Sequence, residues 1–192
     1  IAGFMLTQPS TLGLFDTNIK EVIEIVRQAG GILYGDGANL NALLGKVKPG
    51  ELGFDIVHSN LHKTFTQPHG GGGPGAGAVM VSERMLPYLP SPIVDHKIQE
   101  DGTSTYSLSN PPETIGKMGA FQGNFGALVR AYTYIRTLGK DGIGSIGEDA
   151  VINANYIMSQ LKDDYYLPYE RTCMHEVVFS AKQMKTDHGV SA

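Results

Sequence analysis

The sequence predicts an α/β fold with a mostly parallel sheet. Short apolar segments alternate with a segment of helical period, and a strand, a helix and a second strand fit within roughly the first 35 residues. At 192 residues and 41% hydrophobic content, the chain is long enough to bury a core of one domain or slightly more.

The first strand, helix and second strand follow from local patterns. Residues 2–7 form a short apolar strand, and Asp16 is placed to cap the next helix by accepting hydrogen bonds from its free N–H groups. Residues 32–37, "ILYGDG", form the second strand, parallel to the first because such crossovers are right-handed. The helix is marked by apolar residues at helical spacing and by two glycines that end it: Ile19, Val22, Ile23, Val26, Gly30 and Gly31.

Two more strands and an irregular stretch follow. Residues 54–60, "FDIVHSN", and 77–83, "GAVMVSE", predict the third and fourth strands. Prolines and polar residues are dense from 87 to 119, which predicts an irregular excursion with a hairpin turn at Asp101 and Gly102.

The remaining residues predict two helices and a last strand. Helices are expected over 124–138 and after "GKDG", and a strand over 175–181, so that 139–192 begins a smaller α+β domain. The residues expected to form the buried helix faces are Phe125, Leu128, Val129, Tyr132 and Ile135 in the first, and Ile146, Ala150, Ala154, Ile157 and Leu161 in the second.

Composition excludes several classes of function. The apolar runs are shorter than the roughly 20 residues that a membrane helix needs. The net charge is −4 with basic residues scattered, so neither a membrane nor nucleic acid is an expected partner. The single Cys173 cannot form an internal disulfide and fits a reducing compartment. Because the chain starts at Ile1 and the strand at 175–181 has nothing after it to pair with, we expect a segment of a longer protein.

The glycine run and the histidines near it are weak motifs. Gly70, Gly72 and Gly75 fit G-x-G-x-x-G, but that dinucleotide motif follows a strand and opens a helix, whereas these glycines precede a strand. His58 and His62 straddle a strand end, with His69 nearby and no carboxylate at ligand spacing. We therefore expect no metal site.

Lys63 and Asp36 form a more specific pattern. Lys63 follows the third strand and Asp36 ends the second, and functional groups gather at the carboxyl ends of parallel strands. Removal of Lys63 from water would favour the neutral amine, the form that makes Schiff bases. An amine and a carboxylate there suit pyridoxal phosphate, whose aldehyde bonds to lysine and whose ring nitrogen keeps a proton beside an aspartate. A surface lysine and a turn aspartate are the alternatives.

The chain resembles a known family. "HSNLHKTFTQPHGGGGPGAG", "PSTLGLFD", "YGDGANLNALLG" and "GNFGALVRAYTYIR" are similar to the P-protein family of the glycine cleavage system, the glycine dehydrogenases (decarboxylating), especially the second subunit of the split bacterial form. The resemblance implies the aspartate aminotransferase-like fold of type I pyridoxal phosphate enzymes. Residues 1–138 would be the second half of its large cofactor-binding domain, and 139–192 the truncated start of its C-terminal small domain.

The resemblance also implies roles for individual residues. Lys63 would bond covalently to pyridoxal 5'-phosphate, Asp36 would pair with its pyridine nitrogen, Asn39 would lie near the ring and its phenolic oxygen, and His62 would reach the phosphate. The glycine-rich loop beside Lys63 would be a hinge that admits a lipoyl group, or would let the backbone pack close to the cofactor.

The implied reaction is the oxidative decarboxylation of glycine, with transfer of the aminomethyl group to the lipoyl group of H-protein. The implied partners are lipoylated H-protein and the first subunit of the P-protein, in the bacterial cytoplasm. The resemblance places the ring-stacking residue and much of the phosphate site in the preceding half of the large domain, so the 192-residue chain alone is expected to be inactive. The alternatives are another type I pyridoxal phosphate lyase or decarboxylase, and a noncatalytic subunit of such a complex.

Overall fold

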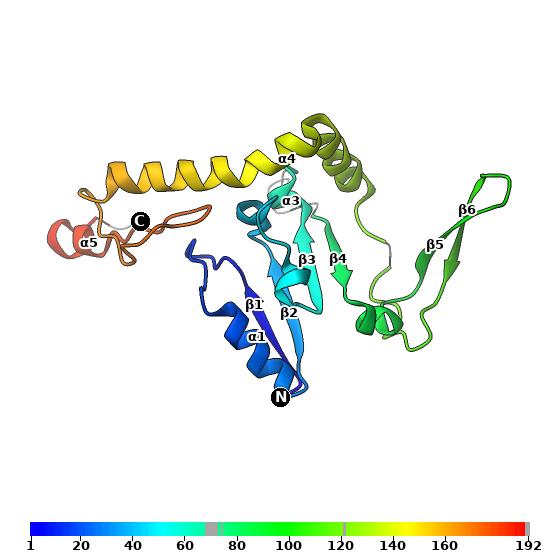
Figure 1. Cartoon of the computed structure of the whole chain (residues 1–192). Coiled ribbons are helices and arrows are strands. Elements are labelled where there is room, and N and C mark those ends of the chain that lie inside the picture. Colours follow the sequence, from blue (N-terminus) through cyan, green and yellow to red (C-terminus); the bar gives the residue numbers. More distant parts are fainter. Residues whose placement is uncertain (68–72, 74, 121, 191–192) are drawn as a thin grey trace.

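The computed structural model describes residues 1–67, 73, 75–120 and 122–190 (Figure 1). The elements are β1 (Gly3–Thr7), α1 (Ile19–Gln28), β2 (Ile32–Gly37), η1 (Leu40–Leu43), α2 (Pro49–Leu52), β3 (Ile56–Asn60), α3 (Leu61–Thr64), β4 (Gly77–Val81), η2 (Glu83–Tyr88), β5 (Ile93–Ile98), β6 (Ser104–Ser109), α4 (Phe125–Leu161) and α5 (Lys182–His188).

A four-stranded sheet forms the centre of the fold, in the order β1-β2-β3-β4. β1, β2 and β3 are parallel, and β4 is antiparallel to β3. The predicted α/β class, the four strands and the mostly parallel sheet are therefore confirmed. In a parallel pair, residues in register point to the same face, so the register decides which side chains meet.

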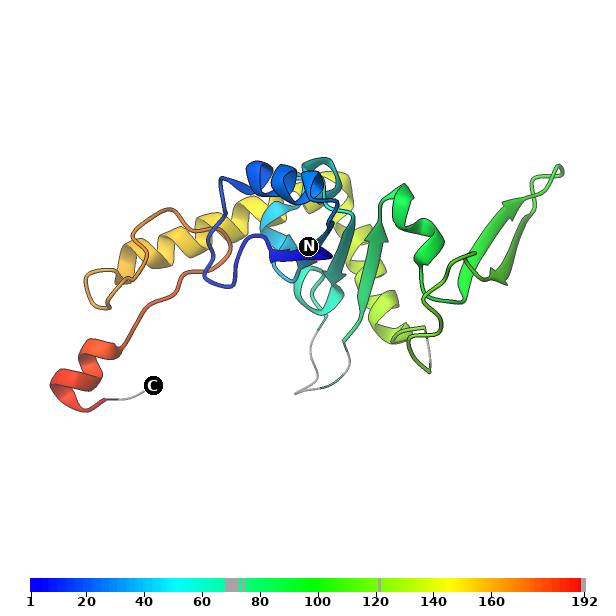
Figure 2. The same cartoon turned by 90° about the horizontal axis from the view of Figure 1, so that it is seen from below.

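The core lies between α1 and one face of the sheet, as Figure 2 shows from below. It is built from the buried side chains of Ile19, Ile23, Val26, Leu33, Phe54 and Val57. Three of these are the predicted apolar positions of α1, and Val22 beside them is half-buried. The predicted cap at Asp16 is wrong: the helix begins at Ile19, and the Asp16 carboxylate instead accepts the N–H of Asn18 at 2.9 Å within the preceding loop.

A buried carboxylate, Asp55, links the second, third and fourth strands. It accepts the backbone N–H of Leu33 at 2.9 Å and an Arg84 guanidinium hydrogen bond at 2.7 Å. Its backbone carbonyl accepts the N–H of Ser82 at 2.8 Å. A buried charge is tolerated only when it is paired and hydrogen-bonded, and Arg84 supplies that pairing just after β4.

The predicted hairpin in the excursion is confirmed. β5 and β6 pair antiparallel, and Gln99 donates its N–H to Thr103 O at 2.8 Å near the turn. The hairpin projects away from the sheet (Figures 1 and 2).

The helical region after residue 124 is broken at Gly139, whose backbone has φ 63° and ψ −171° inside α4. Two helices therefore meet at this glycine, as predicted, although the second begins directly after it and not after "GKDG". The predicted buried face of the first is wrong, because Phe125 is 77% and Tyr132 65% exposed, while Ala127 and Ala131 are buried. The small side chains let α4 approach α3 and η1 closely.

The strand predicted over 175–181 does not form. In the described residues this stretch has only an isolated bridge between Tyr166 and Ser180, and the short helix α5 follows. No helix in the described part of the chain combines the length and apolar character needed to span a bilayer.

Candidate functional site

Asp36 lies one residue before the carboxyl end of β2, on the sheet face opposite α1. The register aligns it with Thr7 of β1 and His58 of β3, so all three side chains occupy the same face. The alternate residues Leu33 and Val57 enter the core on the other face. The parallel sheet thus gathers three polar side chains at one place.

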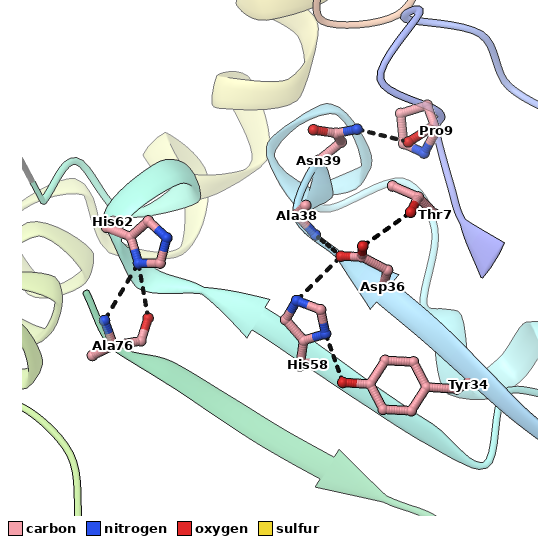
Figure 3. Close-up of polar contacts among 9 residues, drawn as sticks. All are labelled: Thr7, Pro9, Tyr34, Asp36, Ala38, Asn39, His58, His62 and Ala76. Atoms are coloured by element: carbon pink, nitrogen blue, oxygen red, sulfur yellow. Dashed lines mark hydrogen bonds and ion pairs between the residues drawn. The ribbon is translucent and has the colours of Figure 1, made fainter. Parts of the chain in front are cut away.

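Three donors surround the Asp36 carboxylate (Figure 3). Thr7 Oγ1 donates to Oδ2 at 2.9 Å, the Ala38 N–H donates to Oδ1 at 2.8 Å, and His58 Nε2 lies 3.1 Å from Oδ1. The side chains of Asp36 and His58 are about one-fifth exposed. These contacts fix the orientation of a carboxylate that remains open to the space beyond the sheet.

Tyr34 and His58 continue the chain of polar contacts that begins at Asp36. The sequence did not predict a role at the site for either residue. The Tyr34 hydroxyl lies 2.8 Å from His58 Nδ1. Burial, and then the charge of Asp36, raises the pKa of Tyr34, which favours a phenol that donates to Nδ1. His58 Nε2 then carries the proton that faces Asp36. His58 is thus held within the chain by Asp36 and Tyr34 at the edge of the site.

Asn39 is buried at 6% exposure just after β2. Its Nδ2 donates to the carbonyl of Pro9 at 2.9 Å, which ties the start of η1 to the loop after β1. The amide NH₂ is thus used within the chain. The predicted place of Asn39 near a cofactor ring stays a prediction.

Lys63 and His62 lie on the one-turn helix α3, directly after β3. Lys63 is exposed, so the removal from water that would activate its amine is not present in the described chain. His62 Nδ1 lies 3.2 Å from Ala76 O and accepts the Ala76 N–H at 3.3 Å (Figure 3). No contact joins Lys63 to Asp36 among the described residues, although both lie at the carboxyl edge of the parallel strands.

Two other sequence features fall in the same region. Gly70, Gly72 and His69 lie outside the described residues, as does most of the glycine-rich loop proposed as a hinge. Gly75 is described, and a Cβ there would come within 3.1 Å of His62 Nδ1, so this glycine allows the close approach of the ring. The described residues contain no group of three metal-ligating side chains.

A C-terminal segment, residues 173–176, also reaches this edge, and no local pattern predicts it. Asn155 of α4 holds it by donating to Cys173 O at 2.7 Å and accepting the Cys173 N–H at 3.2 Å. The Met174 N–H donates to Gly13 O at 2.7 Å. The segment therefore packs on the loop that follows β1 and Thr7.

Gly13 leaves no room for a side chain. Its φ is +72°, and a Cβ would lie 1.9 Å from the backbone oxygen of Glu176. Gly30 has a similar φ of +74° but open space around it. We expect Gly13→Ala to destabilise the protein by about 1–3 kcal/mol more than Gly30→Ala, because only the first adds a steric clash to the backbone strain. Urea unfolding of the two variants measures the difference, and equal stabilities would contradict it.

The residues present fit pyridoxal phosphate. A carboxylate with fixed orientation can face a protonated ring nitrogen, and a lysine amine one strand along can hold an aldehyde carbon. His62 lies on the same helical turn as Lys63, so its imidazole is a further side chain at this edge that can form hydrogen bonds.

Comparison with known proteins gives close relatives. No family model matches the chain. It is 53% identical over 191 residues to the probable glycine dehydrogenase (decarboxylating) subunit 2 of Chlorobaculum tepidum, covering 99% of this chain and 39% of that protein. It is 55% identical over 184 residues to the protein of that name from Bacillus velezensis, covering 96% and 37%. The resemblance found in the sequence is confirmed, and the chain spans less than two-fifths of these relatives.

A solved structure shows the same fold. The crystal structure of glycine decarboxylase (P-protein) of the glycine cleavage system, in inhibitor-bound form, matches with a TM-score of 0.69 at 19% identity, over 85% of this chain and 38% of that one. The predicted type I fold is confirmed by this likeness.

Proposed function

We propose, from the premise that this chain is related over nearly its whole length to a segment of glycine dehydrogenase (decarboxylating) subunit 2, that it carries part of a pyridoxal phosphate site for the decarboxylation of glycine. The observation that carries the proposal is the Asp36 carboxylate, held by three donors at the end of β2, with Lys63 after the neighbouring strand. A noncatalytic subunit would need neither group.

Each residue has a defined task in this proposal. Lys63 would hold the cofactor aldehyde covalently, and Asp36 would accept a hydrogen bond from the ring nitrogen and so keep its proton in place. His58 and Thr7 orient Asp36. Pyridoxal phosphate supplies, when bound, an electron sink for the bond that breaks at the α-carbon of the amino acid. Asn39 and His62 are assigned to the ring and the phosphate.

The proposal extends to domains and partners. Residues 1–138 would form the second half of the large domain, and 139–192 the start of the small domain. The aminomethyl group would pass to the lipoyl group of H-protein, and the first P-protein subunit would complete the assembly in the bacterial cytoplasm. The glycine-rich loop, largely outside the described residues, is proposed as the hinge that admits the lipoyl arm.

Exchange of labelled carbon dioxide into glycine tests this function. The full-length protein, with its partner subunit, pyridoxal phosphate and lipoylated H-protein, is expected to catalyse the exchange, whereas the 192-residue chain alone is not. Labelling of another amino acid in place of glycine would instead indicate a different decarboxylase. Absence of exchange with every amino acid, despite a bound cofactor, would contradict the proposal.

A further inference from the structure

The Asp36 carboxylate has one acceptor position left open. An ionised carboxylate offers about four lone pairs, two on each oxygen. Oδ1 accepts the Ala38 N–H at 2.8 Å and faces His58 Nε2 at 3.1 Å, so both of its positions are used when His58 donates. Oδ2 accepts the Thr7 hydroxyl at 2.9 Å and keeps one position. Among the described residues, Oδ2 is therefore the oxygen of Asp36 that can still accept a hydrogen bond from a bound molecule (Figure 3).

The use of Oδ1 depends on which nitrogen of the His58 ring carries the proton. A neutral imidazole has one N–H and one bare nitrogen. With the proton on Nε2, the ring donates to Asp36. With the proton on Nδ1, a bare nitrogen would face a carboxylate oxygen at 3.1 Å, and two acceptors would oppose each other. With protons on both, an imidazolium would offset the charge of Asp36. Only the first form fills Oδ1 and leaves the carboxylate its full charge.

Tyr34 selects among these forms because it occupies the other ring nitrogen. It lies two residues before Asp36 on β2, so both side chains are on the same face of the sheet. Its hydroxyl is 2.8 Å from His58 Nδ1. Burial, and then the charge of Asp36, raises the pKa of Tyr34, so the phenol keeps a proton that it can donate to Nδ1. The hydrogen bond at one imidazole nitrogen sets the proton on the other, and here it favours Nε2–H.

We propose that Tyr34 is a positioning residue for Asp36: by donating to Nδ1 it holds His58 in the form with the proton on Nε2, which leaves the one open acceptor of Asp36, on Oδ2, for the ring N–H of the cofactor. This inference rests on the proposed function, because that function assigns the ring nitrogen to Asp36. It adds the tyrosine, the state of the histidine and the accepting oxygen. Only hydrogen bonds are involved, and no proton is transferred.

The first test needs no cofactor. In the full-length subunit with its partner, labelled with ¹⁵N in the histidine rings, the nitrogen chemical shifts show which ring atom carries the proton, and their loss in His58→Gln assigns them. Near neutral pH we expect Nε2 protonated and Nδ1 bare. In Tyr34→Phe, Nδ1 loses its donor and should gain a proton in part of the molecules, whereas Tyr106→Phe, exposed on the hairpin, should change nothing.

Two results of this measurement overturn the proposal. One is a proton on Nδ1, or on both nitrogens, in the unchanged protein. The other is a His58 spectrum in Tyr34→Phe that matches the spectrum of the unchanged protein. The first result is read without altering Tyr34, so it decides the point whatever the stability of the variant.

The second test asks whether Tyr34 acts through His58. Tyr34→Phe, His58→Gln and the double variant are compared by glycine exchange and by the amount of lysine–cofactor adduct, with partner subunit and H-protein present. Tyr34→Phe alone should slow exchange about 10-fold and leave the adduct in place. A glutamine amide can donate to Asp36 without a partner on a second ring nitrogen. Adding Tyr34→Phe to His58→Gln should therefore slow exchange by less than about 2-fold, and an equal loss in both backgrounds would overturn the proposal.

Cofactor labelled with ¹⁵N in its pyridine ring separates this inference from the proposed function. The unchanged protein should show a protonated ring nitrogen, and Tyr34→Phe should move the signal toward that of a bare nitrogen. A protonated nitrogen with the same signal in both proteins overturns the role of Tyr34 and leaves the proposed function standing. If the unchanged protein binds no cofactor, or binds it with a bare ring nitrogen, the task proposed for Asp36 falls and this inference falls with it.

Discussion

A full-length subunit carrying Lys63→Ala will show no absorbance band of a lysine–cofactor adduct, and glycine exchange will fall by about 10⁴-fold. In the role proposed for Lys63, the variant loses both the covalent attachment and an amine that would carry protons at the reacting carbon. The side chain is exposed on α3, so its removal should cost little stability.

The readout is specific to the site. Borohydride reduction followed by peptide mass spectrometry should locate the cofactor on Lys63 in the unchanged protein and on no peptide of the variant. Lys20→Ala, an exposed lysine on α1, is the matched control and should keep both the band and the rate. Retention of the adduct on another lysine in Lys63→Ala would contradict the assignment.

The second large effect is expected for Asp36→Asn. The amide has nearly the shape of the carboxylate, so the adduct on Lys63 should still form. The exchange rate should nevertheless fall by about 10³-fold. The reason is that the variant loses the negative charge proposed to stabilise the protonated ring nitrogen of the cofactor. Thr7, Ala38 and His58 all face this carboxylate, so an amide NH₂ would also meet donors where the native oxygens accept.

Paired measurements of absorbance and exchange rate check this outcome. A normal adduct with a slow rate supports a role for Asp36 at the ring, whereas loss of the adduct would indicate that Asp36 acts on binding or folding. Asp95→Asn, half-buried on the hairpin that projects away from the sheet, is the control for a carboxylate lost outside the site. An unchanged rate in Asp36→Asn would remove Asp36 from the proposed chemistry.

The central sheet could be predicted because its signals are local. The helical period of α1 and the apolar runs of β1 to β3 each depend on a few adjacent residues, and the handedness of the crossover then makes the strands parallel. The same logic places Asp36 at the strand edge. His58 could have been added to the site by the same logic. Ile56 is in register with Tyr34, so His58 is in register with Asp36 on the neighbouring strand.

Features that depend on distant packing could not be predicted. The apolar side chains Phe125 and Tyr132 suggested the inner face of a helix, but the faces that approach α3 and η1 in this chain carry alanine and glycine. Hydrophobicity alone cannot show which neighbour a helix meets. His175 was predicted to be part of a strand, because nothing nearby in sequence indicates that Asn155 and Gly13 hold its segment on the loop after β1.

The break at Gly139 joins two helices with different neighbours. The helix before it lies against α3, which carries Lys63, and the helix after it carries Asn155, which anchors the segment with His175. Asn155 lies 16 residues beyond Gly139, a lever of about 24 Å at 1.5 Å per residue. A turn of about 5° at this one joint would swing the far end by roughly 2 Å, so the place of the segment that Asn155 holds depends on the torsions of a single glycine.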